Sequence, residues 1–112
     1  MKDKIIQTVC KIWSTSLDDV CGKSRKQDVV YTRMTIAYFL RRHTILSTTE
    51  IGRLINRDHS TIIHYLKAYD SEFHFNETFR NFADEIKEKL QDLQYQTPFI
   101  SELEEEFNEI RG

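Results

Sequence analysis

Apolar residues recur along most of the chain at spacings of three and four, which place their side chains on one face of a helix. The pattern is clear over residues 3–14, dense over residues 29–43, and regular again over residues 58–70 and 75–93. One proline and three glycines interrupt the sequence, and so few interruptions favour helices joined by short turns. We therefore predict an all-α fold.

Two short helices joined by a tight turn are expected in the middle of the chain. Ser47 and Glu50 have the S-x-x-E spacing of a capping box, which predicts that a helix begins after residue 47. This helix must be short, because residues 55–58 indicate a turn in which Asp58 or Asn56 acts as the N-cap of the next helix. Such a pair of helices makes a helix-turn-helix.

The segment before this motif combines a short helical turn, a loop and a long helix. We expect the helical turn over residues 17–21 and a polar, mostly basic loop over residues 22–28. The helix that follows is apolar on most sides, so it should be largely buried, with the guanidinium groups of Arg33, Arg41 and Arg42 reaching solvent.

The clearest helical periodicity lies in the C-terminal part. Apolar side chains follow one another there at spacings of four, three, four, four and three. Asn76 is a candidate N-cap of this helix, Pro98 ends the pattern, and Ser101 would begin a last, acidic helix. The amphipathic helix can pack on the domain, pair with a second copy or dock a protein partner. Its apolar residues are Phe75, Phe79, Phe82, Ile86, Leu90 and Leu93.

The net charge of −2 conceals an uneven distribution. Residues 1–70 carry twelve Lys or Arg and seven Asp or Glu, whereas residues 71–112 carry four and eleven. This asymmetry is typical of a polyanion-binding part joined to an acidic part, although solvated helix faces are the simpler explanation of charge alone. We expect a helix-turn-helix domain in residues 1–72, and the amphipathic and short acidic helices in residues 73–112.

Several function classes find no support in the sequence. The hydrophobic share of 39% and charged share of 30% are those of a globular domain that needs no disulfide or metal. Cys10 and Cys21 form no C-x-x-C pair and the histidines are scattered, so we expect no metal site. No catalytic triad stands out, and we expect neither an enzyme nor a cofactor. Because no signal peptide or membrane-spanning run is present, we expect a cytoplasmic, nucleoid-associated protein.

The start of the second motif helix carries the residues that point to DNA. In a helix-turn-helix the second helix lies in the major groove, and its first residues contact base edges. Those residues here are Asp58, His59, Ser60 and Thr61. A carboxylate accepts from cytosine N4, hydroxyls bond base edges or phosphates, a threonine methyl contacts thymine, and an imidazole donates to a base. The alternative is that Asp58 and Ser60 only cap the helix.

Positive charge surrounds this motif, as phosphate contacts require. Residues 22–67 contain nine Lys or Arg and three Asp or Glu. Arg53 and Arg57 flank the turn, and Lys67 lies two helical turns further on. We therefore predict sequence-specific binding of double-stranded DNA. The basic loop adds three cations that can reach a groove or the backbone, Lys23, Arg25 and Lys26.

Residues 51–64, with the sequence IGRLINRDHSTIIH, resemble the signature of the C-terminal DNA-binding domain of the bacterial replication initiator DnaA. That family reads roughly I-G-x-x-F-G-x-R-D-H-[ST]-T-V-x-H. The basic loop and residues 33–37 also look similar to the family, and the resemblance covers roughly residues 5–70. It implies a helix-turn-helix bundle akin to the Trp repressor, here with extra C-terminal helices. The R-D-H-[ST]-T helix would read the major groove, and a loop arginine would enter the minor groove.

The resemblance also assigns roles to single residues. Residues 58–61 match the base-reading positions, and Arg57 matches the arginine before them. Thr48 and Thr49 fall where the family contacts phosphate, and Arg33 matches an arginine early in the long helix. With Lys67 and the loop, the expected DNA-binding residues are Lys23, Arg25, Lys26, Arg33, Thr48, Thr49, Arg57, Asp58, His59, Ser60, Thr61 and Lys67.

This chain departs from the family pattern in three places. Its turn has Asn56 alone where the family has two residues. Counting back from the long helix puts Gln27 at the position of the minor-groove arginine, and Tyr31 and Thr32 replace an Arg-Pro pair. We therefore expect DNA binding without requiring the family's target sequence.

We expect the ATPase of the initiator to be absent, because the three glycines of this sequence cannot supply a G-x-x-x-x-G-K-[ST] loop. We expect a free-standing DNA-reading module, such as a phage, mobile-element or accessory protein, in replication initiation, its regulation or transcription control. A homodimer would suit palindromic half-sites. The alternative is a protein-interaction adaptor that recruits partners through the helix of residues 75–93.

Overall fold

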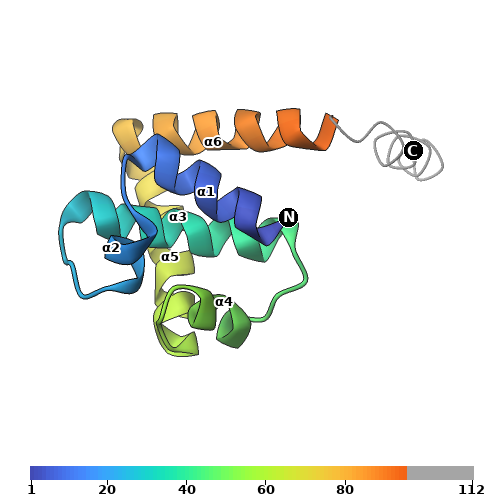
Figure 1. Ribbon diagram of the computed structural model, residues 1–112. Coiled ribbons are helices and arrows are strands. Elements are labelled where there is room, and N and C mark those ends of the chain that lie inside the picture. Colours follow the sequence, from blue (N-terminus) through green and yellow to red (C-terminus); the bar gives the residue numbers. More distant parts are fainter. Residues whose placement is uncertain (96–112) are drawn as a thin grey trace.

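Helices account for most of the chain in the computed structural model, which describes residues 1–95 (Figure 1). Within those residues no strand occurs, so the all-α prediction is confirmed. The last predicted helix, with Pro98 and Ser101, lies outside the described residues. The helices are α1 (Lys2–Trp13), α2 (Leu17–Cys21), α3 (Gln27–His43), α4 (Thr48–Leu54), α5 (His59–Phe75) and α6 (Glu77–Tyr95).

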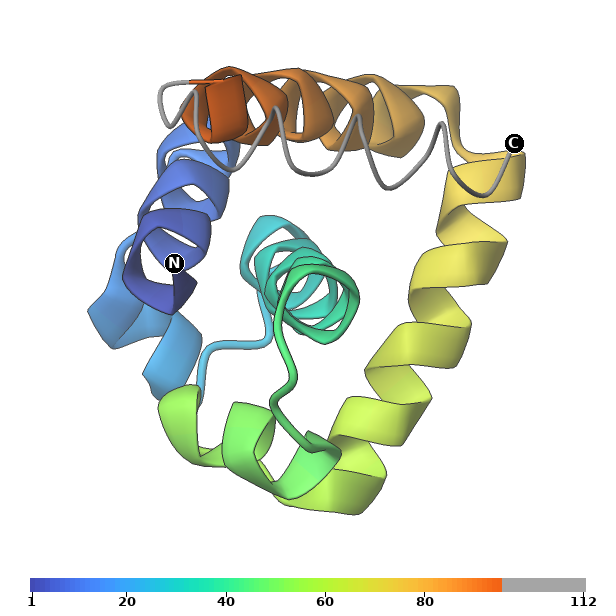
Figure 2. The same ribbon diagram turned by 90° about the vertical axis from the view of Figure 1, so that its right-hand side faces the viewer.

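Helix α3 forms the centre of the molecule. Figure 2 shows it nearly end-on, with the other helices arranged around it. It packs against α1, α2, α4 and α5. Ile36, Ala37 and Leu40 on this helix are fully buried. The dense apolar pattern of residues 29–43 is therefore explained, because a central helix has neighbours on nearly every side.

The helix starts that the sequence predicted are present. The Ser47 side chain accepts a hydrogen bond from the Glu50 N–H (3.1 Å), and the Glu50 side chain accepts one from the Ser47 N–H (3.2 Å). This is the expected capping box. The Asn76 side chain accepts from the Phe79 N–H (3.1 Å) and so caps α6, also as predicted. Caps are local in sequence, which makes them visible before the fold is known.

Two predicted boundaries were wrong. The basic loop ends at residue 26, because Gln27 and Asp28 already belong to α3. Asp28 lies in the first turn of α3, where the helix dipole favours a negative charge. Phe75 ends α5 with 87% of its surface exposed, and α6 begins only at Glu77. The extended backbone of Asn76 separates the two helices.

The apolar face of α6 packs on the domain. Helix α6 crosses α1 and the C-terminal end of α5 (Figures 1 and 2). Phe79, Ile86 and Leu90 are buried in the same core as α1. The Trp13 ring lies 5.6 Å from Phe79 and 4.5 Å from Phe82, centroid to centroid. Of the roles left open for this helix, packing on the domain is the one observed. Pairing with a second copy or with a protein partner stays a prediction. The domain boundary at residue 72 also stays a prediction.

No helix in residues 1–95 combines the length and the apolar character that crossing a lipid bilayer requires.

Candidate nucleic-acid interface

A four-residue turn joins α4 to α5, and its backbone is closed by one carbonyl. The Gly52 carbonyl accepts hydrogen bonds from the N–H groups of Ile55 (3.2 Å) and Arg57 (2.8 Å). Asn56 adopts a left-handed conformation with φ 58°, a region that asparagine enters more readily than most residues. The turn over residues 55–58 therefore connects the two helices, as predicted.

Gly52 is the point at which α4 and the turn approach most closely. A Cβ at this position would lie 2.2 Å from the Arg57 carbonyl oxygen. That oxygen belongs to the backbone and cannot rotate away, so only glycine fits without displacing the turn. Ile51, Ile55 and Ile62 are fully buried and attach the motif to the core; each contributes about 1.5–3 kcal/mol of hydrophobic stabilisation.

Asp58 caps α5 and remains exposed. Its Oδ1 accepts from the Thr61 N–H (2.8 Å) and from the Ser60 hydroxyl (3.0 Å). Hydrogen bonds from Thr61, through its side chain and its backbone, and from Ser60 lower the pKa of the Asp58 carboxyl, so the group is ionised at neutral pH. Both of these short hydrogen bonds end on Oδ1, and the side chain as a whole remains exposed. The cap and an outward-facing acceptor therefore coexist in one side chain.

The other side chains at the start of α5 are accessible. His59 and Ser60 are exposed and Thr61 is half-buried. Lys67, two turns along α5, is also exposed. At the start of α4, Thr49 is exposed and Thr48 is half-buried. These side chains all belong to the helix-turn-helix.

The expectation that Arg33 reaches solvent was wrong. Its side chain is only 3% exposed. Its Nε donates to the Val20 carbonyl (2.8 Å) and its Nη1 to the Ser24 carbonyl (2.6 Å). Its Nη2 donates to the carbonyls of Asp19 (2.9 Å) and Gly22 (3.1 Å). Burial lowers the pKa of this guanidinium.

Arg33 therefore holds the loop, and its buried guanidinium is not exposed on the surface. The last carbonyls of a short helix are short of donors, although the Gly22 N–H does donate to the Asp19 carbonyl (3.2 Å). A buried cation, in turn, needs acceptors on every side. The Arg33 guanidinium supplies donors to these carbonyls, and the carbonyls supply the acceptors that its buried charge requires. Arg33 is removed from the candidate contacts for this reason.

Arg57 ties the turn to the basic loop. Its Nη2 donates to the Gly22 carbonyl (2.5 Å), while its Nη1 donates to the Asn56 carbonyl (2.8 Å). The Asn56 amide also donates to the Cys21 carbonyl (3.2 Å). Two adjacent residues of the turn are thus bonded to the last residue of α2 and the first residue of the loop. Arg57, expected next to the base-reading residues, is half-buried and has a structural role of its own.

The basic loop consequently lies beside the helix-turn-helix. Lys23, Arg25 and Lys26 are exposed on it. Figures 1 and 2 place this loop, α4 and the start of α5 toward one end of the molecule, with α6 at the opposite end. The elements that carry the expected contacts other than Arg33 therefore lie away from α6.

Two departures from the family pattern have structural explanations. The Tyr31 hydroxyl donates to the Glu72 carboxylate (3.2 Å), which links α3 to α5. The Thr32 hydroxyl donates to the Asp28 carbonyl (2.7 Å) and accepts from Thr15 (3.0 Å). Both side chains serve internal packing. Gln27, at the position of the family's minor-groove arginine, donates to the Tyr31 hydroxyl (2.7 Å).

Sequence reasoning missed the roles of Gly52 and Asn56. The signal for Gly52 was present, because a glycine inside a predicted helix marks a close backbone approach or a helix end. No comparable signal existed for Asn56, whose side chain bonds a residue 35 positions away.

The sequence matches a family model described as the bacterial dnaA protein helix-turn-helix over residues 2–68, more than half of the chain. The chain belongs to this DnaA family. The resemblance and the helix-turn-helix bundle inferred from the sequence are thereby confirmed. The matched region ends before α6, so α6 lies outside the family model.

Curated relatives of this DnaA-family chain are chromosomal replication initiator proteins DnaA. The protein of Bacteroides fragilis is 35% identical over 89 residues, covering 79% of this chain and 19% of the relative. Those of Lachnoclostridium phytofermentans and Flavobacterium psychrophilum are 32% and 34% identical, covering 79% of this chain and 20% and 19% of the relatives. The chain thus spans about a fifth of the length of these relatives.

Proposed function

We propose that this chain binds double-stranded DNA sequence-specifically, with the start of α5 in the major groove and the basic loop against the adjacent backbone or minor groove. One observation supports the proposal most directly: the turn before the polar side chains that begin α5 is bonded by Arg57 to the loop with three exposed cations, and by Asn56 to the end of α2 just before that loop. Specific binding needs the base-reading side chains of α5 and the phosphate-binding cations of the loop at a fixed distance and orientation from each other. The family membership supports the same function.

The proposed contacts follow from the chemistry of each group. The exposed carboxylate of Asp58 accepts from cytosine N4, and His59 donates to a purine acceptor. Ser60 and Thr61 contact base edges or the phosphate beside them. The hydroxyls of Thr48 and Thr49 contact the backbone, and Lys67 contacts phosphate further along the groove. In place of the missing minor-groove arginine, Arg25 is the loop side chain we propose for the minor groove.

The biological setting we propose is bacterial chromosome replication, its initiation or its regulation. It rests on the family and on relatives that are named as replication initiators. A module of this kind acts by binding without a catalytic step and would be found with the cytoplasmic nucleoid.

Selection of bound sequences from a random duplex pool tests the proposal. We expect a defined consensus to be enriched. The His59→Ala variant should lose about 1–3 kcal/mol of binding free energy on the selected duplex and little on a scrambled one, because a base contact is removed. Lys89→Ala, on α6 away from the motif, is the matched control. A pool that yields no consensus, or equal losses on both duplexes, would contradict base reading by this helix.

A further inference from the structure

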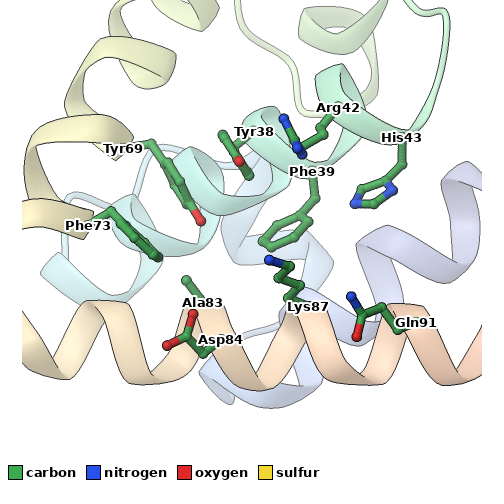
Figure 3. A pocket seen from close by; sticks show the side chains of 10 residues that line it. All are labelled: Tyr38, Phe39, Arg42, His43, Tyr69, Phe73, Ala83, Asp84, Lys87 and Gln91. Atoms are coloured by element: carbon green, nitrogen blue, oxygen red, sulfur yellow. The ribbon is translucent and has the colours of Figure 1, made fainter. Parts of the chain in front are cut away.

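One side of α5 is covered by the rest of the protein. Ile62, Tyr65 and Tyr69 are the buried residues of this helix. Figure 3 shows Tyr69 and Phe73 directed toward α3 and α6, and Tyr69 stacks on Tyr38 with ring centroids 3.9 Å apart. Apolar side chains on this side of α5 therefore already have partners within the fold.

Ile63 is an apolar side chain of α5 that the fold leaves uncovered. It is 41% exposed, and among the described residues it belongs neither to the core nor to the half-buried side chains packed against the core. Its neighbours one helical turn away, His59, Ser60 and Lys67, are exposed and polar. A single exposed isoleucine is ordinary on a protein surface, and it is too small a patch to indicate a protein partner.

The place of Ile63 on α5 puts it between two proposed DNA contacts. His59, Ile63 and Lys67 follow one another at spacings of four residues, so they form one stripe along the helix. The stripe begins with a proposed base contact and ends with a proposed phosphate contact. A rise of about 1.5 Å per residue puts Ile63 about 6 Å along the helix from His59, or roughly two base-pair steps of about 3.4 Å. With the start of α5 in the major groove, Ile63 also faces base edges.

The chemistry of the major groove limits what an isoleucine can contact there. Its base edges present hydrogen-bond donors, hydrogen-bond acceptors and one apolar substituent, the C5-methyl group of thymine. An isoleucine against a donor or an acceptor would take that group out of water without supplying a partner, which costs free energy. Against a thymine methyl, both apolar groups leave water together, which stabilises the complex.

We propose that Ile63 recognises a thymine through its C5-methyl group and is a specificity-determining residue beyond residues 58–61. This inference rests on the proposed DNA binding and names one of the bases that the helix selects. The thymine lies about two base pairs from the base that His59 contacts, toward the phosphate that Lys67 contacts.

Deoxyuridine scanning of the selected duplex tests the contact. Replacing one thymine by deoxyuridine removes the C5-methyl group and keeps every hydrogen-bonding group of the base pair. At one thymine of the consensus, the parent chain should bind the deoxyuridine duplex about fourfold more weakly, the factor that corresponds to one buried carbon group. Ile63→Ala should bind the thymine duplex more weakly by at least this factor, and it should not distinguish thymine from deoxyuridine at that position.

Lys67→Ala is the matched control on the same stripe of α5. It removes a phosphate contact, so it should weaken binding to the thymine and deoxyuridine duplexes by the same factor and keep the discrimination between them. Unchanged circular dichroism of both variants shows that the fold is retained.

The converse test adds a methyl group to a base that lacks it. With a C·G pair in place of that T·A pair, 5-methylcytosine should bind the parent chain about fourfold more tightly than cytosine. Ile63→Ala should bind the two duplexes equally. Equal binding by the parent chain would contradict recognition of the methyl group.

Three further results would each overturn the proposal and leave sequence-specific binding intact. The first is a consensus without thymine, and the second is equal binding of the thymine duplex and every deoxyuridine duplex by the parent chain. The third is an Ile63→Ala variant that keeps the discrimination of the parent chain at every thymine. A random pool that yields no consensus would instead contradict the proposed function, and this inference with it.

Discussion

Two residues, Gly52 and Arg33, fix the backbone on which the candidate interface stands. Gly52 allows α4 to touch the turn, and Arg33 gathers four carbonyls of α2 and the loop. Both residues are buried, so neither is exposed on the candidate interface. Their effect on binding would therefore be indirect, through the position of the groups that they hold.

Gly52→Ala should destabilise the fold. The new Cβ would meet the Arg57 carbonyl oxygen at 2.2 Å, and relieving such an overlap costs about 1–3 kcal/mol. Urea unfolding followed by circular dichroism measures the change. Arg53→Ala, at the exposed neighbouring position, should stay within about 0.5 kcal/mol of the parent chain. Equal stability of Gly52→Ala and the parent chain would show that the backbone of the turn moves away from the added Cβ at little cost in free energy.

Arg33→Met should cost about 2–4 kcal/mol of unfolding free energy, because four carbonyls lose a charged donor. Arg33→Lys keeps the charge but cannot span four acceptors with one ammonium group, so it should recover only part of the loss. The same urea titration compares them. If Arg33→Lys were as stable as the parent chain, the fork geometry of the guanidinium would be irrelevant.

The elements of this fold differ in how far the sequence reveals them. The capping box of α4 and the Asp58 cap of α5 were predictable, since each involves residues at most three apart. The burial of Arg33 was not, because its acceptors lie 9 to 14 residues earlier in the chain and meet it only after α2 folds onto α3. The base-reading roles of residues 58–61 remain predictions, because Asp58 would cap α5 in the same way whether or not the helix binds DNA.

The two caps give stability a defined pH dependence. The hydrogen bonds with Ser47 and with Thr61 lower the pKa values of Glu50 and Asp58 in the folded chain below their ordinary 4.5 and 3.8. As pH falls, these carboxyls therefore bind protons in the unfolded chain before they do so in the folded chain. The stabilisation is complete above the ordinary pKa values and is lost as pH falls through the lowered pKa values of the folded chain. Urea unfolding measured from about pH 6 downward should show this loss of stability, because the series then begins above the ordinary pKa values of both carboxyls.

Replacing both carboxylates tests the assignment. The Glu50→Gln, Asp58→Asn double variant should be less stable than the parent chain at neutral pH and should lose less stability on acidification. Parallel pH curves for the two proteins would mean that other carboxylates cause the acid response.

At the scale of the whole molecule, α6 completes the core and the helix-turn-helix lies at the other end. Phe79 and Phe82 cover Trp13, and Ile86 and Leu90 extend that contact. The amphipathic pattern of α6 was predictable, but the surface that it covers was not, because periodicity reports a buried face and not its neighbour.

Truncation measures what α6 contributes. A chain ending at residue 76 should be several kcal/mol less stable than a chain ending at residue 96, because four buried apolar side chains of α6 are removed and the α1 surface beneath them is exposed. Thermal unfolding of the two chains makes the comparison. Equal stability would support an independent domain ending near residue 72.

The central claim is that the start of α5 and the basic loop act as one DNA-binding surface. The most direct test is affinity for the selected duplex as a function of salt concentration, for the parent chain and for Lys23→Ala and His59→Ala. We predict a steep salt dependence whose log–log slope falls by about 1 in Lys23→Ala, and an unchanged slope with weaker specific binding in His59→Ala. Binding by the parent chain that does not depend on salt, or no binding at all, would contradict the account.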